Sequence, residues 1–521
     1  MNKNKKISKA PLIVSIAILV YIVLLLLLVH VESASPESGI TTIQAGLWYT
    51  ITTLTTVGYG DLYPVTSSGK IIGAVFQLMS LGVLVALFSF MLSFLRGKFV
   101  PRQKLGFSRK KQWYIFAERN RFTESLAAGL EKERPDGSVI FSEEKRTIGE
   151  GPGFGAEFSP SELLEIKKGK GNASLFFMSE NILDNEQRAK QFESTGSQIY
   201  CMTAHEPEQL PANIHIFDPY RICARAYWKR FPIENDHENI VMIGGGKYAS
   251  GILEQAMIQN VLDPHQAICY RMYGNYNEFI RLHPYLETIV TVGQKDPDRD
   301  SLIFSKEPWS SALDIIAEAD RIIVCTDREE DTILTLILLF KYCPVQGKVY
   351  ARLSMPFDST EVFGSYSEVF APEHVLRDEL NRYAVRLHEM YMEASPGRYP
   401  PWNELGCFLR GSNLAAADHL EYKLRILLGP EAGNTVTPEL CRRAFEVYKG
   451  LGPEERERCR AIEHERWMRF HIMNNWRYGE PRDNKKRLHP LLRPYEELST
   501  KEREKDDYGW RFLEELGNLP D

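Results

Sequence analysis

Seven consecutive residues, Thr55-Thr56-Val57-Gly58-Tyr59-Gly60-Asp61, combine side chains and backbone that could hold a dehydrated cation. A K⁺ ion that loses its water needs carbonyl oxygens in its place. Successive carbonyls face the same way only if the backbone alternates hand, and glycine at positions 58 and 60 permits the left-handed conformations that this requires. The predicted cation ligands are the Thr56 hydroxyl and the backbone carbonyls of Thr56, Val57, Gly58 and Tyr59.

Two apolar stretches flank these residues. Residues 12–29 are apolar apart from Ser15 and Tyr21, and residues 71–95 are polar only at Gln77 and a few serines. A helix needs roughly 20 such residues to cross a bilayer. A cleaved signal peptide is the alternative for the first stretch, but its apolar core is longer than the usual ~7–15 residues. The sequence therefore predicts two membrane-spanning helices.

Basic residues gather on the outer sides of the two predicted helices. Four lysines precede the first helix and four basic residues follow the second, whereas Lys70 is the only lysine or arginine between them. Such residues stay on the cytoplasmic side of a membrane. We therefore expect a multi-pass protein of the cell inner membrane, embedded in the lipid bilayer with both termini in the cytoplasm.

The whole segment resembles the pore domain of two-span potassium channels. The resemblance rests on the seven residues at 55–61, on the helical pattern at 41–53 and on the two apolar stretches. It implies K⁺ as the permeant ion and a selectivity filter made of Thr56, Val57, Gly58, Tyr59, Gly60 and Asp61. It also implies an aromatic cuff that holds the filter open, made of Trp48, Tyr49 and Tyr59.

Assembly and gating follow from the same resemblance. A filter needs four loops and this chain has one, so the resemblance implies a homotetramer. Gly82, about midway along the second predicted helix, matches the hinge of the pore-lining helix in such channels. A packing glycine is the alternative for Gly82, because glycine is common in membrane helices. Neither helix carries a regular arginine series, so direct voltage sensing is not expected.

The next segment alternates predicted strands and helices. A buried strand is predicted at Trp113–Phe116, and further strands at 139–141, 175–177 and 199–201. This alternation indicates a parallel sheet. The turn after the first strand lacks glycine where a dinucleotide would touch it, so we predict a Rossmann-type unit without a dinucleotide site. The glycine-rich run at 149–155 is interpreted as a surface loop, because no strand leads into it.

A second unit repeats this plan with its glycines present. The buried strand Ile240–Ile243 leads into Gly244-Gly245-Gly246-Lys247-Tyr248-Ala249, which satisfies Gly-x-Gly-x-x-Ala in its strand–turn–helix context. The helix N-terminus there would suit a phosphate. The acidic residue expected some 20 positions later is missing, and Arg271 could face a phosphate or a partner instead. The predicted nucleotide site is Gly244, Gly246, Ala249 and Arg271, with a purely structural turn as the alternative.

Two such units behind a two-span pore resemble the regulator-of-potassium-conductance (RCK) arrangement, over about residues 110–392. The resemblance implies eight units in a tetramer, enough for a gating ring that acts on the pore. The rival interpretation is an enzyme that uses the Gly244 turn for a nicotinamide cofactor. The missing acidic residue and the lack of an acid/base constellation disfavour an enzyme, so no catalytic residue is predicted.

The last segment resembles the ryanodine-receptor repeat (RyR) domain. The resemblance rests on Glu463–Trp467, Asn475–Gly479, His489-Pro490 and residues 494–498. Bacterial members of this family occur in predicted nucleotide-signalling and defence proteins. Aromatic side chains beside cationic ones suit a base and its phosphates, and equally a protein partner. Core packing is the alternative for the tryptophans. The predicted ligand residues are His464, Trp467, Trp476, Arg477, Tyr478, Lys486, His489 and Arg493.

Composition excludes several classes of protein. The 521 residues include 63 Lys and Arg against 69 Asp and Glu, a net charge of −6, so a nucleic-acid partner is not expected. A mean hydropathy of −0.29 excludes a polytopic transporter. The 8 cysteines form no Cys-x-x-Cys pair, so neither a zinc site nor a disulfide scaffold is indicated.

These observations predict a membrane α-helical pore joined to cytoplasmic α/β Rossmann-like units and a mainly α C-terminal RyR-type domain. The five predicted segments are a pore domain at 1–104, Rossmann-like units at 105–236 and 237–394, a helical linker at 395–453 and the RyR-type domain at 454–521. We expect a K⁺-selective channel gated by a nucleotide-type ligand, with bacterial antiphage defence as its role. The alternatives are an NAD(P)-dependent or nucleotide-regulated K⁺ uptake channel and a non-conducting membrane sensor.

Overall fold

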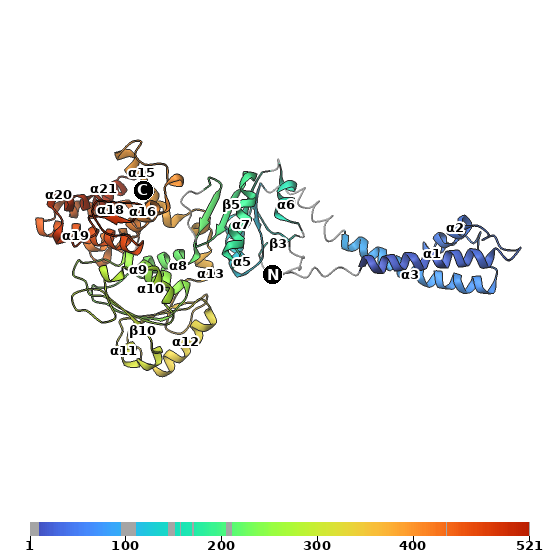
Figure 1. Ribbon diagram of the computed structural model, residues 1–521, viewed down its shortest axis with the longest axis horizontal. Helices are drawn as coiled ribbons and strands as arrows, with labels where there is room; N and C mark the ends of the chain where they lie inside the picture. The colour runs from blue at the N-terminus through green and yellow to red at the C-terminus, as the bar shows by residue number, and fades with distance from the viewer. Residues whose placement is uncertain are drawn as a thin grey trace. The chain divides into compact units, whose positions relative to one another are not determined.

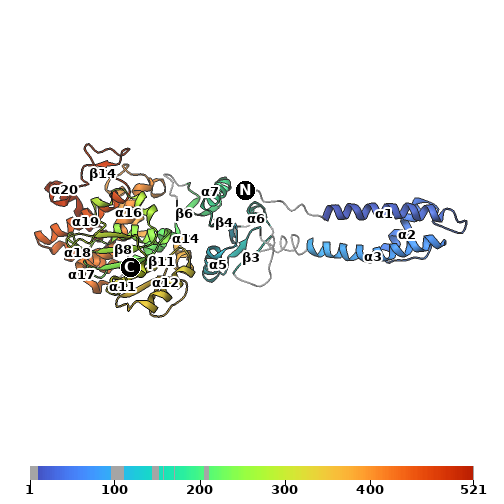
Figure 2. The same ribbon diagram turned by 60° about the horizontal axis from the view of Figure 1, so that its bottom comes forward.

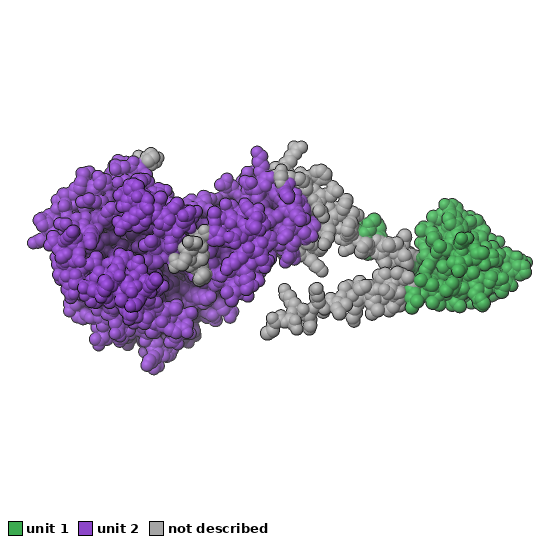
Figure 3. Space-filling model, turned by 45° about the horizontal axis from the view of Figure 1, so that its top comes forward, with its two compact units in different colours: residues 1–108 green, residues 109–521 purple. Residues whose placement is uncertain are grey.

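The computed structural model describes residues 10–94, 111–143, 152–156, 158–168, 171–204, 211–433 and 435–519. The chain forms two compact units, Met1–Ser108 and Arg109–Asp521, which Figure 3 shows in separate colours. The flanking basic residues from which we predicted the membrane orientation, at 3–9 and 96–104, lie outside the described residues. That prediction therefore stays a prediction.

The first unit contains three helices, α1 (Ala10–Glu32), α2 (Ile43–Leu54) and α3 (Ser67–Phe94). Thr42 caps α2, because its side chain accepts a hydrogen bond from the backbone N–H of Ala45. A small core joins the three helices and consists of Leu25, Leu28, Ile40, Tyr49 and Phe76. In the part of the chain that is described, no helix has the length and apolar character needed to cross a membrane.

The second unit begins with a parallel sheet whose strand order is β3-β2-β1-β4-β5-β6. This is the Rossmann order, as predicted from the alternating pattern. The strands are β1 (Gln112–Phe116), β2 (Ser138–Phe141), β3 (Phe154–Gly155), β4 (Asn172–Phe177), β5 (Gln198–Met202) and β6 (Ile214–Phe217). The interpretation of 149–155 as a loop is wrong at its end, because Phe154–Gly155 pairs with β2 and forms the sheet edge.

A second parallel sheet has the order β13-β12-β11-β7-β8-β10-β9. It is again the Rossmann order, with the short β9 added at one edge. The strands are β7 (Asn239–Gly244), β8 (Cys269–Tyr273), β9 (Thr291–Val292), β10 (Ser301–Ser305), β11 (Arg321–Cys325), β12 (Lys348–Arg352) and β13 (Glu361–Phe363). The strand order reverses between β7 and β11, where ligands bind in folds of this class.

Helices cover both faces of the second sheet (Figure 1). On one face lie α8 (Pro219–Arg230), α9 (Lys247–Gln259) and α10 (Asn277–Leu282), and on the other lie α11 (Leu313–Ala317) and α12 (Glu329–Tyr342). The first sheet is flanked by α5 (Arg121–Glu133), α6 (Pro160–Lys167) and α7 (Ile182–Phe192). The short helices α13 (Tyr366–Val369) and α14 (Pro372–Val375) return to pack on α5, with Phe122 stacked on Phe370.

The C-terminal part is helical and lies beyond α8 and α9 (Figures 1 and 2). Its helices are α15 (Arg382–Ala394), α16 (Cys407–Asp418), α17 (Leu420–Leu428), α18 (Pro438–Gly450), α19 (Pro453–Met473), α20 (Thr500–Arg503) and α21 (Asp507–Gly517), with the strand pair β14 (Arg477–Tyr478) and β15 (Leu488–His489). Helix α19 packs on α9, and Arg469 Nη1 donates to Asp300 Oδ2 at 2.7 Å. Both residues are buried, so the RyR-like segment is built into the core of this unit.

Candidate ion filter and ligand cavities

The segment that follows α2 alternates its backbone hand as the sequence predicted. Thr56, Gly58 and Gly60 have φ angles of 60°, 57° and 74°. These values lie in the left-handed region, whereas Val57 and Tyr59 between them are absent from the residues with positive φ. Because every second residue is left-handed, the carbonyls of neighbouring residues can turn to one side of the segment. This is the backbone that a row of carbonyl ligands for K⁺ requires.

Contacts with α2 hold residues 55–61 in place. The Thr52 carbonyl at the end of α2 accepts hydrogen bonds from the backbone N–H of Val57 at 3.0 Å and of Gly58 at 3.2 Å. The rings of Trp48 and Tyr59 lie parallel with centroids 5.8 Å apart. Trp48 Nε1 also donates to Asp61 Oδ2 at 2.8 Å. Of the predicted cuff residues, Trp48 therefore braces the segment, through the ring of Tyr59 and the carboxylate of Asp61.

Tyr49, the third predicted cuff residue, packs in another direction. It is buried in the small core with Phe76 of α3, and a Cβ placed at Gly73 would lie 2.8 Å from its hydroxyl. Within one chain, Tyr49 thus joins α2 to α3. The structure places Gly82, the predicted hinge, within α3, and its surroundings lie outside the described residues.

Glu32 is a buried carboxylate that the sequence patterns did not predict. It ends α1 with no exposed surface. Its oxygens accept from the Ser38 hydroxyl at 2.6 Å, the Thr66 hydroxyl at 2.6 Å and the backbone N–H groups of Val65 and Thr66 at 3.0 Å. One side chain therefore ties the end of α1 to the segment that leads from the filter into α3. An acidic residue at the end of an apolar run was the available signal.

The glycine turn after β7 is explained by the packing of the chain itself. Gly244 has a φ of 129°, and a Cβ there would overlap the Cys325 carbonyl. Gly246 has a φ of 92°, and a Cβ there would overlap the Asp327 carboxylate. Asp327 accepts from the backbone N–H groups of Lys247 and Tyr248, each at 3.2 Å. A carboxylate of the chain thus occupies the helix N-terminus that the sequence assigned to a phosphate.

The other two residues of the predicted nucleotide site lie apart from this turn. Ala249 is fully buried in α9, and Arg271 lies on β8. Burial raises the pKa of Tyr273, and the charge of Arg271 and its hydrogen bond with Tyr273 offset part of that rise. Neither Ala249 nor Arg271 lines the large cleft that opens at Gly246. Of the four predicted residues only Gly246 lines this cleft, and the nucleotide site at Gly244, Gly246, Ala249 and Arg271 stays a prediction.

Neutralising Asp327 tests whether its carboxylate keeps phosphates from the turn. Asp327→Asn keeps the size of the side chain and removes the charge that would repel a phosphate beside it. We expect about tenfold tighter binding of ADP to the purified full-length protein, measured by calorimetry. Asp331→Asn, an exposed carboxylate in the first turn of α12, is the matched control and should bind ADP as the wild type does. Unchanged affinity in Asp327→Asn would show that phosphates do not use this turn.

A cleft of about 1590 Å³ extends from this turn to the RyR-like segment, and we call it the central cleft. Gly246, Lys247 and Asp327 lie in its wall, together with Trp476, Arg482 and Lys485 from the region after α19. Trp476 is 5% exposed, and its ring stacks on Phe408 with centroids 5.0 Å apart. The core-packing alternative therefore describes Trp476 better than a free stacking platform.

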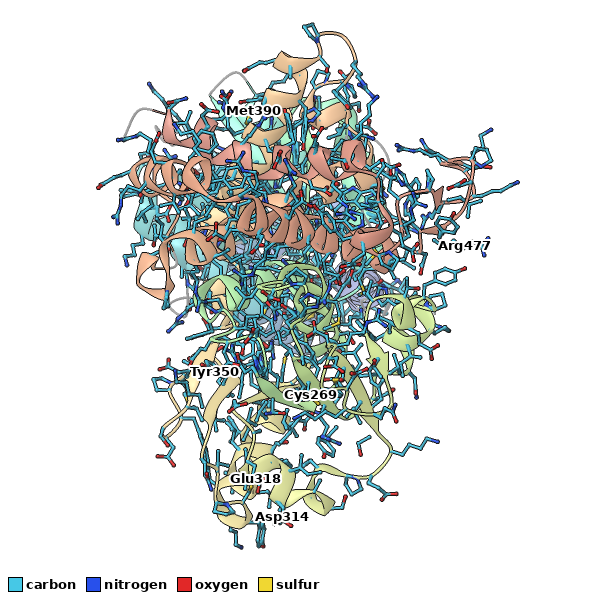
Figure 4. All side chains as sticks on the ribbon, turned by 90° about the vertical axis from the view of Figure 1, so that its left-hand side faces the viewer. Cys269, Asp314, Glu318, Tyr350, Met390 and Arg477 are labelled. Atoms are coloured by element: carbon cyan, nitrogen blue, oxygen red, sulfur yellow. The ribbon has the colours of Figure 1, made fainter. Side chains whose placement is uncertain are left out.

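A second hollow of about 430 Å³ lies between α15, α16, α17, α19 and α21, and we call it the RyR cavity. Among the predicted ligand residues, His464, Trp467 and His489 line it. Arg477, Tyr478, Lys486 and Arg493 line neither this cavity nor the central cleft. Figure 4 shows Arg477 at the edge of the unit, where it is exposed. The Arg493 guanidinium lies 3.6 Å from the Glu502 carboxylate. The backbone carbonyl of Arg493 lies 3.0 Å from His464 Nε2.

The histidines of this region differ in their protonation. Burial lowers the pKa of His471 to about 3 and that of His489 to about 4. Burial would also lower the pKa of His464, but the Asp506 carboxylate, whose Oδ2 lies 3.5 Å from Nδ1, and the Arg493 carbonyl beside Nε2 together outweigh burial and raise the pKa. At pH 7 the first two rings are therefore neutral, and His464 is the one histidine of the three whose surroundings favour the charged form.

His471 makes the unit sensitive to acid. The pKa of His471 is about 3 in the folded chain and 6.5 in the unfolded chain. Below pH 6.5 the unfolded chain therefore binds the proton first, and the free energy of unfolding decreases as the pH is lowered. Between pH 7 and pH 5 the expected loss is about 2 kcal/mol. His471→Gln should show a smaller fall in melting temperature between these pH values than the wild type. An equal fall in both proteins would contradict the assignment of a neutral buried ring.

Comparison with known proteins places two segments in families. Residues 13–97 match the family described as ion channel, and residues 455–516 match the RyR domain. The Shaker-related potassium channel tsha2 of Oncorhynchus mykiss is 51% identical over 43 residues, which are 8% of this chain and 9% of that protein. The A-type voltage-gated potassium channel KCND3 of Homo sapiens is 50% identical over 56 residues, 11% of this chain and 8% of that protein. The chain thus spans less than a tenth of the length of these relatives.

Two solved structures share a low similarity with most of the chain. The GsuK channel bound to ADP has 16% identity and a TM-score of 0.33, over 71% of this chain and 99% of that one. The GsuK channel bound to NAD has 14% identity and a TM-score of 0.31, over 72% and 85%. Residues 13–97 are therefore similar to ion channels, a family of membrane proteins, and residues 455–516 are similar to RyR domains.

Proposed function

We propose that four copies of this chain form a K⁺-selective channel that opens or closes with a nucleotide-type ligand bound by the second unit. The observation that carries the K⁺ selectivity is the alternating backbone hand at Thr56, Gly58 and Gly60, on the residues of a potassium-channel filter. Carbonyl rings of this kind replace the water shell of K⁺. Similarity to potassium channels over 43 and 56 residues supports the same proposal.

The tetramer is supported by apolar side chains that a single chain leaves uncovered. Val57 is 53% exposed and Tyr59 is 67% exposed, beside residues of α2 that are also exposed. The exposed large apolar side chains of α2 are Ile43, Leu47, Trp48 and Ile51. A contiguous patch of this kind marks a surface that other copies or lipid cover. Four filter segments around one axis would bring Val57 and Tyr59 of neighbouring copies together.

Flux through liposomes tests conduction directly. The full-length protein, reconstituted with a K⁺ gradient, should carry K⁺ and exclude Na⁺. Absence of flux under every ligand would favour the alternative of a non-conducting membrane sensor. Turnover of a nicotinamide cofactor by the same preparation would favour the enzyme alternative. Both measurements use one sample, so they separate the three classes of function.

The ligand is proposed to be a nucleotide because both hollows of the second unit combine aromatic and cationic walls. The central cleft carries Lys247, Arg482 and Lys485 near aromatic side chains, and it is large enough for an oligonucleotide signal of the kind expected in antiphage defence. An ADP or NAD ligand would instead fit K⁺ homeostasis. Mass spectrometry of nucleotides released from the purified protein distinguishes the two roles.

A further inference from the structure

The wall of the RyR cavity contains a buried ion cluster with more positive than negative groups. The Glu463 carboxylate accepts from Arg466 Nη2 at 2.7 Å and lies 2.9 Å from Lys423 Nζ. All three side chains line the cavity and are buried, with the Arg466 side chain 3% exposed. Asp506 is a second carboxylate that lines the cavity and acts on Arg466. The whole wall carries four basic side chains, Lys423, Arg466, Arg482 and Lys505, against three carboxylates, Glu463, Glu502 and Asp506. Because a buried cation needs an anionic partner, the cluster can accept a further negative charge.

Arg466 has an unused hydrogen-bond donor. Its Nε and Nη2 both donate to Glu463, whereas its Nη1 has no acceptor among the residues that the structure describes. Lys423 Nζ, in contrast, also donates to the Gly509 carbonyl at 2.7 Å. A guanidinium that is buried with one free nitrogen loses the hydrogen bond that water would have given it. An anion in the cavity would restore that bond as a charge-assisted one.

Aromatic rings form the rest of the wall. Tyr391 of α15 and Tyr508 of α21 stack with centroids 5.0 Å apart, and Tyr399 lies 6.2 Å from Tyr391. Trp467 lines the cavity from α19 and is only partly buried. Such rings bind a planar group through stacking, with little dependence on its identity. The cavity thus offers a place for a planar ring beside a place for an anion.

We propose that the RyR cavity binds a single nucleotide, with its phosphate at Arg466 and Lys423 and its base against the tyrosine and tryptophan rings. A volume of about 430 Å³ lies at the lower end of the ~300–1,000 Å³ typical of small-molecule sites. The site is therefore sized for a mononucleotide, whereas the central cleft of about 1590 Å³ is larger than that range.

This site bridges two parts of the second unit. Lys423, Tyr391 and Tyr399 come from the helical region before the RyR domain, and Arg466, Trp467 and Tyr508 come from the RyR domain. Helices α16 and α19, which both line the cavity, pack against each other. A bound nucleotide would hold these two parts together. Its effect on K⁺ flux rests on the proposed function, but its binding does not.

Binding of AMP to the full-length protein tests the site. Calorimetry should detect AMP, while adenosine and inorganic phosphate alone should bind much more weakly, because each fills one half of the cavity. Arg466→Lys keeps the buried charge beside Glu463 but removes the free Nη1. It should weaken AMP binding about tenfold, the loss expected for one charge-assisted hydrogen bond. Melting temperature is measured for each variant to establish that it is folded.

Arg469→Lys is the matched control. Arg469 lies on the same helix with the same 3% exposure, but its nitrogens pair with Asp300 and Glu465 and it does not line the cavity. It should bind AMP as the wild type does. The proposal is overturned if AMP does not bind at millimolar concentration, if a folded Arg466→Lys binds AMP as tightly as the wild type, or if both variants lose affinity equally. AMP binding without any change in K⁺ flux would support the site and contradict ligand gating.

Discussion

Alanine at Gly58 is expected to reduce K⁺ flux to background while the assembled protein persists. Gly58 has a φ of 57°, and a side chain in this left-handed region costs about 1–2 kcal/mol per residue. Four copies in the proposed tetramer multiply that cost around one axis. The strain is relieved by rotating the neighbouring peptide, which turns a carbonyl away from the ion. Flux from liposomes loaded with K⁺ measures the effect, and size-exclusion chromatography measures assembly.

A matched control separates an effect on the filter from the effect of backbone strain alone. Gly196 has a φ of 70° and, like Gly58, nothing within 4 Å of an added Cβ. Gly196→Ala therefore introduces the same kind of backbone strain in the second unit, far along the chain from the filter, and should conduct K⁺ normally. If Gly58→Ala keeps the wild-type preference for K⁺ over Na⁺, the filter assignment is wrong.

The sequence predicted the fold well where local patterns determine it. The two Rossmann strand orders follow from the alternation of apolar strands and helices, because each parallel pair needs a crossover helix. The strands at 139–141, 175–177 and 199–201 all appear within β2, β4 and β5. The edge strand β3 was missed because it pairs through two residues only, and a short edge strand has almost no apolar pattern of its own.

The candidate sites were predicted less well because they depend on contacts between distant residues. Gly244 and Gly246 matched a nucleotide motif, yet Asp327, which follows β11 some 80 residues later, accepts from the helix N-terminal N–H groups that the motif assigns to a phosphate. Arg466 entered the sequence analysis only as part of the RyR resemblance at Glu463–Trp467, and its free Nη1 becomes visible once Glu463 and Lys423 are placed around it. Tyr391, Tyr399 and Lys423 come from segments that carried no motif. Their role follows from packing alone.

The ligand residues predicted in the RyR-like segment also depend on contacts between distant residues. Helical spacing places His464, Trp467 and His471 on one face of α19, where the ring of Trp467 contacts those of His464 and His471. It did not separate Trp476, buried on Phe408, from Arg477 next to it, which is exposed at the edge of the unit. Neighbouring residues outside a helix can point to opposite sides, and sequence spacing does not show which side faces a cavity.

Replacing Glu32 by alanine is expected to disrupt the first unit more than any other single truncation there. The backbone N–H groups of Val65 and Thr66 would lose their acceptor in a buried site, at about 1–3 kcal/mol each. The hydroxyls of Ser38 and Thr66 would lose the same partner. The assembled channel should therefore dissociate at a lower temperature and lose K⁺ flux. Glu32→Gln keeps the size of the side chain and should fall between alanine and the wild type.

Two further variants show whether the carboxylate itself is responsible. Glu37→Ala removes an exposed carboxylate five residues later and should behave like the wild type. Gly69→Ala leaves Glu32 in the chain but places a Cβ where the carboxylate lies, so it should reproduce the Glu32→Ala defect. If both Glu32→Ala and Gly69→Ala assemble and conduct normally, the hydrogen bonds of Glu32 do not hold the filter segment to α1. If only Gly69→Ala fails, steric crowding at the start of α3 matters and the carboxylate does not.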